Sequence, residues 1–113
     1  ERRNGKDVTM RRAFKMRLKP GCESIYKEKH DAVWPGVEAA LLADGVTSFS
    51  IYRSGLDLFA YIESTQPGKD SAEADQITRD WWRMMEDYME SNDDHTPKTW
   101  DLEEMYHLEA QGE

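Results

Sequence analysis

Two hydrophobic periodicities alternate along this chain in a fixed order, and that order constrains the fold more than any other feature of the sequence. Apolar and charged residues alternate over residues 11–18, which predicts a half-buried β-strand. Strand patterns return at residues 46–52 and 56–62, and the short turn Arg53-Ser54-Gly55 between them predicts an antiparallel hairpin. A last alternation over residues 102–108 predicts a fourth strand.

Helical patterns occupy the two gaps between these strands. The first begins near Glu23 and is interrupted at Trp34-Pro35, because proline disfavours the α conformation in the residue before it. Proline is accepted in a first helical turn, so a separate helix is predicted over residues 35–43. The second pattern runs with helical spacing from Ile77 to about Glu90.

The resulting order β-α-β-β-α-β predicts an α+β chain of the ferredoxin-like type, with one antiparallel sheet and its helices on one face. The strands carry apolar residues on both faces in places, for example Leu58 and Ala60 against Phe59 and Tyr61. An exposed apolar sheet face is most easily covered by a second copy of the chain. We therefore expect a homodimer of the dimeric α+β barrel type.

The length of 113 residues suits one domain, predicted over residues 10–109. Residues 1–9 show no periodicity and are predicted to be a disordered or added tail, and residues 110–113 form a second tail. The single Cys22 cannot form an internal disulfide, which favours a reducing compartment. No apolar run approaches the roughly 18 residues that span a bilayer, and no signal-peptide pattern appears, so a cytoplasmic location is predicted.

The charge narrows the choice of partners. The chain has 23 acidic and 15 basic residues and a formal net charge of −8. Nucleic acids and anionic membrane surfaces attract basic patches, so neither is an expected partner. A neutral small molecule such as a sugar needs hydrogen bonds and stacking instead of counter-charge, and it remains compatible with this composition.

Tyr26 and His30 stand four residues apart on a predicted helix, so their side chains project from the same face. The phenol can hydrogen-bond a ligand, and the imidazole titrates near neutral pH, which suits it to proton transfer. The alternative is an exposed pair with surface contacts only, because this spacing is weak when it occurs alone.

Three tryptophan side chains lie in the predicted helical segments, and their rings must be packed in the core or bind a partner. Trp34 lies where the helix must break, and its ring is expected to fill that kink in the core. Trp81 and Trp82 are adjacent on a helix and point about 100° apart, so both rings cannot share one core stripe. One of them is therefore expected to reach a pocket or an interface, where an indole face packs well on a sugar.

The sequence contains no motif for a metal site, a phosphate-binding loop or a serine nucleophile. The histidines His30, His95 and His107, taken with Cys22, show no metal-ligand spacing. There is no glycine-rich phosphate loop and no G-x-S-x-G nucleophile motif. His95 is expected in a solvated loop and His107 on the surface of the last strand. By elimination, any chemistry is proton transfer on a small molecule without a cofactor.

The segment from Arg12 to Leu108 resembles the L-rhamnose mutarotase family. The resemblance rests on five stretches that are specific only in combination: Ala13-Phe14-x-Met16, Tyr26-x3-His30-x3-Trp34-Pro35, Gly45 leading into Ser50-Ile51-Tyr52, Trp81-Trp82-x2-Met85, and Asn92-x-Asp94-x2-Pro97. It implies a dimeric α+β barrel and the interconversion of the α and β anomers of L-rhamnose, with no cofactor.

The resemblance also implies roles for single residues. His30 falls on the family's proton donor, and Tyr26, Trp81 and Trp82 fall on its sugar-contacting positions. A further sugar-contacting position, commonly tyrosine, is Phe49 here. The loop that commonly reads Asn-Pro-Asp-Asn-Ser-Pro is Asn92-Asp93-Asp94-His95-Thr96-Pro97. Both departures concern the identity of the sugar more than the reaction.

Three alternatives remain open. The same reaction on another 6-deoxy sugar, such as L-fucose, requires no change in the chemistry. A cofactor-free monooxygenase on the same dimeric fold would need an apolar pocket for an aromatic substrate and would consume oxygen. A ligand-binding dimer without catalysis would bind a sugar and leave its anomer exchange unchanged.

Overall fold

The computed structural model describes residues 9–68 and 73–110, and within them the chain forms an α+β fold. The elements follow in the order β1 (Met10–Arg17), α1 (Glu23–His30), α2 (Pro35–Ala43), β2 (Val46–Ser54), β3 (Asp57–Ser64), α3 (Gln76–Met85) and β4 (Trp100–Leu102). The four strands form one sheet in the order β2-β3-β1-β4, and every pairing is antiparallel. The predicted ferredoxin-like order is therefore confirmed.

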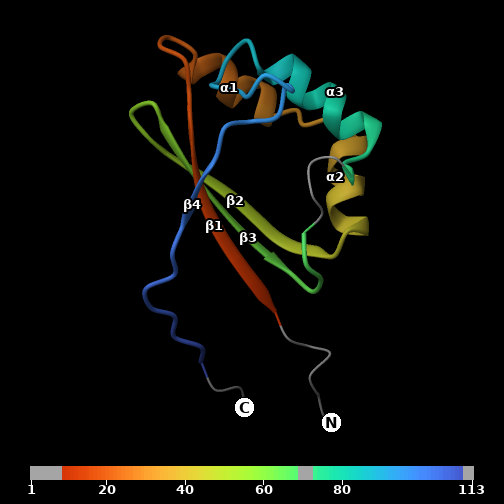
Figure 1. Ribbon diagram of the computed structural model, residues 1–113, viewed down its shortest axis with the longest axis vertical. Coiled ribbons are helices and arrows are strands. Elements are labelled where there is room, and N and C mark those ends of the chain that lie inside the picture. The colour runs from red at the N-terminus through yellow and green to blue at the C-terminus, as the bar shows by residue number, and fades with distance from the viewer. Residues whose placement is uncertain (1–8, 69–72, 111–113) are drawn as a thin grey trace.

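All three helices lie together on one side of the sheet (Figure 1). The pairing register explains how the strands meet them, because Phe14 lies opposite Ala60 and Met16 opposite Leu58. Alternate strand residues point to the same face, so these four buried side chains all face the helices. They form one core together with the buried residues of the helices and loops: Leu18, Tyr26, Val37, Trp81, Met85 and Met89.

The other face of the sheet carries aromatic residues, and none of the three helices of the described residues covers it. One row across the four strands joins Tyr52, Phe59, Lys15 and Trp100 through their pairing register. Tyr52 is 67% exposed and Trp100 is 39% exposed, and the Lys15 ammonium lies 4.9 Å from the centre of the Trp100 ring. We call this surface the outer sheet face.

The first helix ends earlier than the sequence pattern indicates. It stops at His30, and Asp31 is its C-terminal cap. A longer helix would need the Pro35 nitrogen to donate to the Asp31 carbonyl, which proline cannot do, and its ring would clash there. The cap residue Trp34 instead starts α2, and its carbonyl oxygen accepts bonds from the backbone nitrogens of Val37 and Glu38.

The predicted end of the α3 region at about Glu90 is also wrong, because the helix stops at Met85. Backbone pairing with the end of β1 replaces the last helical turn. The Glu90 nitrogen donates to the Arg17 carbonyl, and the Lys19 nitrogen donates to the Tyr88 carbonyl. Tertiary hydrogen bonds therefore redirect a segment whose side-chain spacing is helical.

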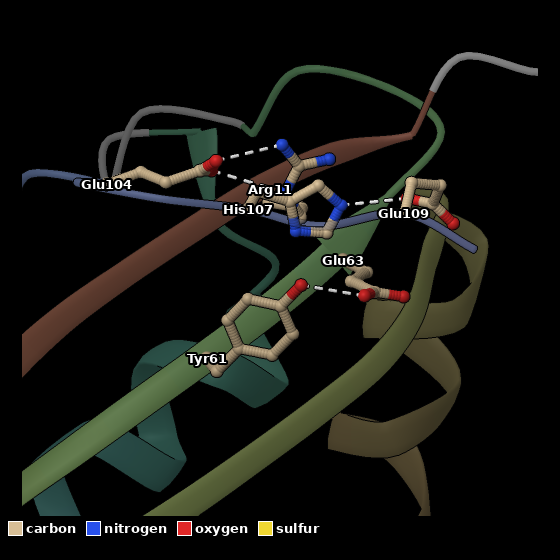
Figure 2. A network of polar contacts seen from close by, with 6 residues as sticks. All are labelled: Arg11, Tyr61, Glu63, Glu104, His107 and Glu109. Carbon is tan, nitrogen blue, oxygen red and sulfur yellow. Dashed lines mark hydrogen bonds and ion pairs between the residues drawn. The ribbon is translucent and has the colours of Figure 1, made fainter.

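The predicted last strand is displaced: β4 covers Trp100–Leu102, and residues 103–110 are in no strand. Arg11 makes two hydrogen bonds to the Glu104 carboxylate, at 3.2 and 3.0 Å (Figure 2). β1 itself continues past its last pair with β4, since Ala13 pairs with Leu102 and Met10–Arg12 pair with β3 alone. The apolar side chains Met105, Tyr106 and Leu108 are 75–83% exposed.

Two further expectations concern the ends of the chain and the membrane. The predicted tails, 1–9 and 110–113, lie almost entirely outside the described residues. Across 9–68 and 73–110, no helix combines the length and the apolar character that crossing a membrane requires.

Candidate functional site

The candidate site begins with Tyr26 and His30 on α1. Their spacing of four residues stacks the two rings, whose centres lie 4.1 Å apart with an angle of 23° between the ring planes. Tyr26 is 6% exposed and belongs to the core, whereas His30 is half-buried. Tyr26 and His30 therefore share one face of α1, as predicted, and this face points into the core at Tyr26.

A backbone contact fixes the protonation pattern of His30. Its Nδ1 lies 3.1 Å from the Tyr26 carbonyl oxygen, and a carbonyl can only accept, so Nδ1 carries the proton. In the neutral ring Nε2 is then left as an acceptor. Burial lowers the pKa of His30, opposed in part by this backbone hydrogen bond and by the Asp31 charge. The neutral ring with an available Nε2 is therefore the form present near pH 7.

Two tryptophan rings extend this group across the helices. The Trp81 ring of α3 meets His30 edge-on, with centres 5.4 Å apart, and meets Trp34 edge-on at 5.2 Å. We call Tyr26, His30, Trp34 and Trp81 the ring cluster. Edge-to-face contacts of this kind stabilise the relative orientation of aromatic rings. His30 is therefore held between Tyr26 on its own helix and Trp81 on another.

A glycine allows α2 and α3 to approach closely enough for these contacts. Gly36 lies in the first turn of α2, next to the side chain of Ile77 in α3. A Cβ atom added to Gly36 would lie 3.2 Å from Ile77 Cγ1. Any larger residue here would press against α3, which carries Trp81.

A cleft of about 130 Å³ opens beside Tyr26 and His30, between α1 and the sheet. Its α1 wall carries polar groups, and Ile51 of β2 and Leu58 of β3 form an apolar wall opposite. Eight residues line it in all: Glu23, Tyr26, Lys27, His30, Ile51, Tyr52, Arg53 and Leu58. Burial raises the pKa of Tyr26, so its hydroxyl stays protonated.

The Tyr26 hydroxyl makes no hydrogen bond to any residue in the described part of the chain. Buried polar groups in proteins are nearly always hydrogen-bonded to protein or water. A buried hydroxyl beside a cleft and next to a histidine acceptor is therefore positioned to bind a ligand. The pair offers one donor and one acceptor, which is what proton transfer between two ligand oxygens requires.

The other predicted site residues lie around this cleft without lining it. Trp81 contacts His30 from the core. Trp82 is half-buried and packs against the core. Phe49 is 39% exposed and shares the helix-facing side of β2 with Ile51, since these residues pair with Ile62 and Ala60 of β3. The structure brings Tyr26, His30 and Trp81 into contact and leaves Trp82 and Phe49 apart from them.

Sequence reasoning missed Ile51 and Leu58 as residues of the cleft. The hairpin pattern places both on apolar strand positions, but it does not indicate which helix covers them. Trp34 was assigned to the core at the helix break, and the structure adds its ring contact with Trp81. No local spacing could have indicated that contact, because Trp34 begins α2 and Trp81 lies in α3.

The remaining histidines lie apart from the ring cluster. His95 pairs with Glu86, and His107 pairs with Glu109 (Figure 2). Neither lines the cleft beside Tyr26 and His30. Among the residues that the structure describes, no group of three or more His, Cys, Asp or Glu side chains is arranged to hold a metal ion.

Comparison with known proteins places this chain in a family. The sequence model of the family described as L-rhamnose mutarotase matches residues 11–108. The chain belongs to the L-rhamnose mutarotase family. The match includes the sheet except for Met10, the first residue of β1, together with the three helices and the cleft, and it confirms the resemblance seen in the sequence motifs.

Individual members of the L-rhamnose mutarotase family align with this chain over nearly their whole length. An L-rhamnose mutarotase of Bacteroides thetaiotaomicron is 38% identical over 102 residues, which cover 88% of this chain and 98% of the relative. An L-rhamnose mutarotase of Shigella flexneri is 34% identical, again over 88% and 98% of the two chains. The crystal structure of an L-rhamnose mutarotase from Formosa agariphila superposes with a TM-score of 0.80 at 36% identity, covering 88% of this chain and 99% of that one.

Proposed function

We propose that this chain is an isomerase that interconverts the α and β anomers of L-rhamnose. In this proposal His30 transfers the protons and Tyr26 hydrogen-bonds the sugar beside it, and we call the two residues the acid–base pair. Membership of the family supports the reaction. The observation that carries the site is the buried Tyr26 hydroxyl, which has no hydrogen-bond partner in the described residues and lies in one cleft with His30. Phe49, Trp81 and Trp82 are included in the proposal as sugar-contacting residues on the ground of the family motifs, since none of the three lines the cleft itself.

The chemistry of anomer exchange fits these groups. When the pyranose ring opens, the bond between the anomeric carbon and the ring oxygen breaks, the anomeric hydroxyl loses its proton and the ring oxygen gains one. Closure on the other face of the aldehyde reverses both transfers. His30 is neutral and presents Nε2, so it takes the proton from one sugar oxygen and returns one to the other. Such assistance contributes typically about 10²–10⁴-fold, which suffices for a reaction that already proceeds slowly in water.

Tyr26 has a supporting role in this scheme. Its raised pKa makes it a poor acid, but its hydroxyl donates a hydrogen bond to a sugar oxygen and holds that oxygen beside His30. Each proton released at one oxygen is recovered at the other, so no external acid or base is consumed.

Saturation-transfer NMR on the native chain tests the function directly. The rate of α/β exchange is measured for L-rhamnose, L-fucose and L-mannose with and without protein, and oxygen uptake is followed in parallel. The proposal requires faster exchange of L-rhamnose than of the other two sugars. Faster exchange of L-fucose than of L-rhamnose would establish L-fucose as the substrate. Oxygen uptake would establish a monooxygenase, and sugar binding without faster exchange would establish a non-catalytic binding protein.

Phe49 gives a second test of the sugar-binding residues. Adding a hydroxyl by Phe49→Tyr is expected to tighten L-rhamnose by roughly 2- to 13-fold, the value of one net hydrogen bond. Phe59→Tyr on the outer sheet face adds the same hydroxyl away from the cleft and is expected to change nothing. Sugar titrations of both variants measure the effect. If Phe49→Tyr alters neither affinity nor sugar ranking, Phe49 serves packing alone.

The outer sheet face supports the proposal that the chain is a homodimer. This face carries Tyr52, Phe59, Tyr61 and Trp100, and none of the helices in residues 9–68 and 73–110 covers it. The apolar side chains after β4 are exposed as well. A second copy would cover both, and for a chain of 13.2 kDa this burial adds to a modest core.

Light scattering at micromolar concentration checks the homodimer. The expected mass is that of two 13.2-kDa chains. Phe59→Glu on the outer sheet face is expected to shift the native mass toward a single chain, because it places a charge in the proposed interface. Leu42→Glu is the matched control, since Leu42 is an exposed apolar residue of α2, 68% exposed. A native chain that is monomeric and fully active would refute the dimer.

A cytoplasmic location also remains a proposal. The single cysteine, Cys22, is unpaired, and free thiols are usual in reducing compartments. Fractionation of cells that express the native gene would decide it.

A further inference from the structure

The cleft beside Tyr26 and His30 has two walls of different chemistry. The α1 wall offers the Tyr26 hydroxyl and the His30 imidazole, and the opposite wall includes the aliphatic side chains of Ile51 and Leu58. Leu58 is 1% exposed and lies within the core. Ile51 is half-buried, so it is the apolar side chain of this wall that still has surface available to a ligand.

The two cations that line the cleft already have partners. The Lys27 ammonium pairs with the Asp31 carboxylate on the same helix. The Arg53 guanidinium donates to the Gly55 carbonyl oxygen at 2.9 Å. Either cation would have to give up its present partner in order to turn toward Ile51.

The structure of L-rhamnose requires such a wall next to the acid–base pair. The ring oxygen that takes part in the reaction is bonded to C5, and C5 carries the methyl group of this 6-deoxy sugar. The methyl group is therefore only two bonds from an atom that the acid–base pair must reach. With the ring oxygen beside His30 and Tyr26, the methyl group lies in the same cleft, and its favourable neighbour there is Ile51.

We propose that Ile51 is a specificity-determining residue that selects the C5 methyl group of the sugar over a hydroxymethyl group. This inference rests on the proposed acid–base pair. L-Mannose differs from L-rhamnose only by a hydroxyl on C6, and neither Ile51 nor Leu58 can hydrogen-bond that hydroxyl. A polar group buried without a partner reduces kcat/KM by about 5- to 150-fold, within the range of a hydrophobic pocket that meets an added hydroxyl.

The test compares two matched variants, Ile51→Thr and Ile62→Thr. Both isoleucines lie on the helix-facing side of neighbouring strands and pack against the core, but only Ile51 lines the cleft. Threonine keeps the β-branch that suits a strand and supplies a hydroxyl. Ile51→Thr is expected to lower the ratio of kcat/KM for L-rhamnose over L-mannose at least fivefold, and Ile62→Thr to leave it within twofold.

L-Lyxose separates loss of selectivity from general damage, because it carries only hydrogen at the position of the C5 substituent. Its exchange rate is expected to change equally little in the two variants. A folded Ile51→Thr variant that keeps the native ratio overturns the role of Ile51. Absence of exchange on L-rhamnose by the native chain would instead refute the mutarotase function, and the role of Ile51 with it.

A measurement on the native protein covers the case in which Ile51→Thr does not fold. Isotope labelling of the isoleucine methyl groups gives resolved signals that include Ile51, Ile62 and Ile77. With L-rhamnose at saturation, a nuclear Overhauser effect is expected between the sugar methyl protons and Ile51. An effect at another isoleucine, or none at Ile51, would overturn the inference.

Discussion

Replacing His30 with alanine is expected to reduce the catalysed rate of L-rhamnose anomer exchange by about 10²–10⁴-fold, the usual contribution of a general acid–base group. The Tyr26 carbonyl holds Nδ1 as a donor, which leaves Nε2 as the proton acceptor of the site. No other histidine lines the cleft. Saturation-transfer NMR measures the exchange, and circular dichroism checks that the variant is folded.

The control for this variant is His95→Ala, which removes a histidine that pairs with Glu86 outside the cleft. Its exchange rate is expected to stay native. Near-native exchange in a folded His30→Ala protein would remove His30 from the mechanism.

The pH profile of the native chain provides an independent measure of His30. Because burial lowers its pKa below the ordinary 6.5, the neutral form persists as the pH falls, and the acidic limb of kcat/KM is expected below pH 6.5. The unfolded chain takes up this proton at a higher pH than the folded chain. Acidification through pH 6.5 therefore lowers the free energy of unfolding.

Replacing Trp81 with alanine is expected to lower the free energy of unfolding by about 3–5 kcal/mol, the usual cost of removing a buried aromatic side chain. Trp81 is 7% exposed, and its ring contacts both His30 and Trp34. The substitution would leave a cavity and remove the edge-on ring contact that holds His30 in place. The exchange of L-rhamnose anomers is therefore expected to slow as well. Urea unfolding followed by circular dichroism measures the stability, and NMR measures the exchange.

The neighbouring Trp82→Ala variant is the matched control for stability. Trp82 is half-buried at the edge of the core, so its removal is expected to cost less than half as much as that of Trp81. Because Trp82 is a proposed sugar contact, the Trp82→Ala variant is expected to stay folded and to have a higher KM for L-rhamnose. Equal stability losses in the two variants would show that the ring contacts of Trp81 add nothing to its burial.

Local patterns predicted much of this fold because they depend on neighbouring residues alone. The alternation over residues 11–18 and the turn at Arg53-Ser54-Gly55 gave β1 and the hairpin of β2 and β3. Proline at position 35 predicted the helix break, since it lacks a donor for the preceding turn. The family motifs predicted the membership that the comparison confirmed.

The same local patterns failed where backbone groups found partners far along the chain. The helical spacing after Met85 is overridden by hydrogen bonds that join Glu90 to Arg17 and Lys19 to Tyr88. The alternation over residues 102–108 describes side chains and carries no information on backbone pairing, and β4 ends at Leu102 although β1 continues to Met10. A strand exists only where a neighbour accepts its hydrogen bonds.

The candidate site divides in the same way. The sequence by itself determined that Tyr26 and His30 share a helix face, because a spacing of four residues corresponds to about one helical turn. Only the tertiary structure decided that Trp81 supports His30 from another helix and that Ile51 faces them across the cleft. These contacts depend on how helices and sheet pack, and packing is set by the whole core and not by the spacing within any one segment.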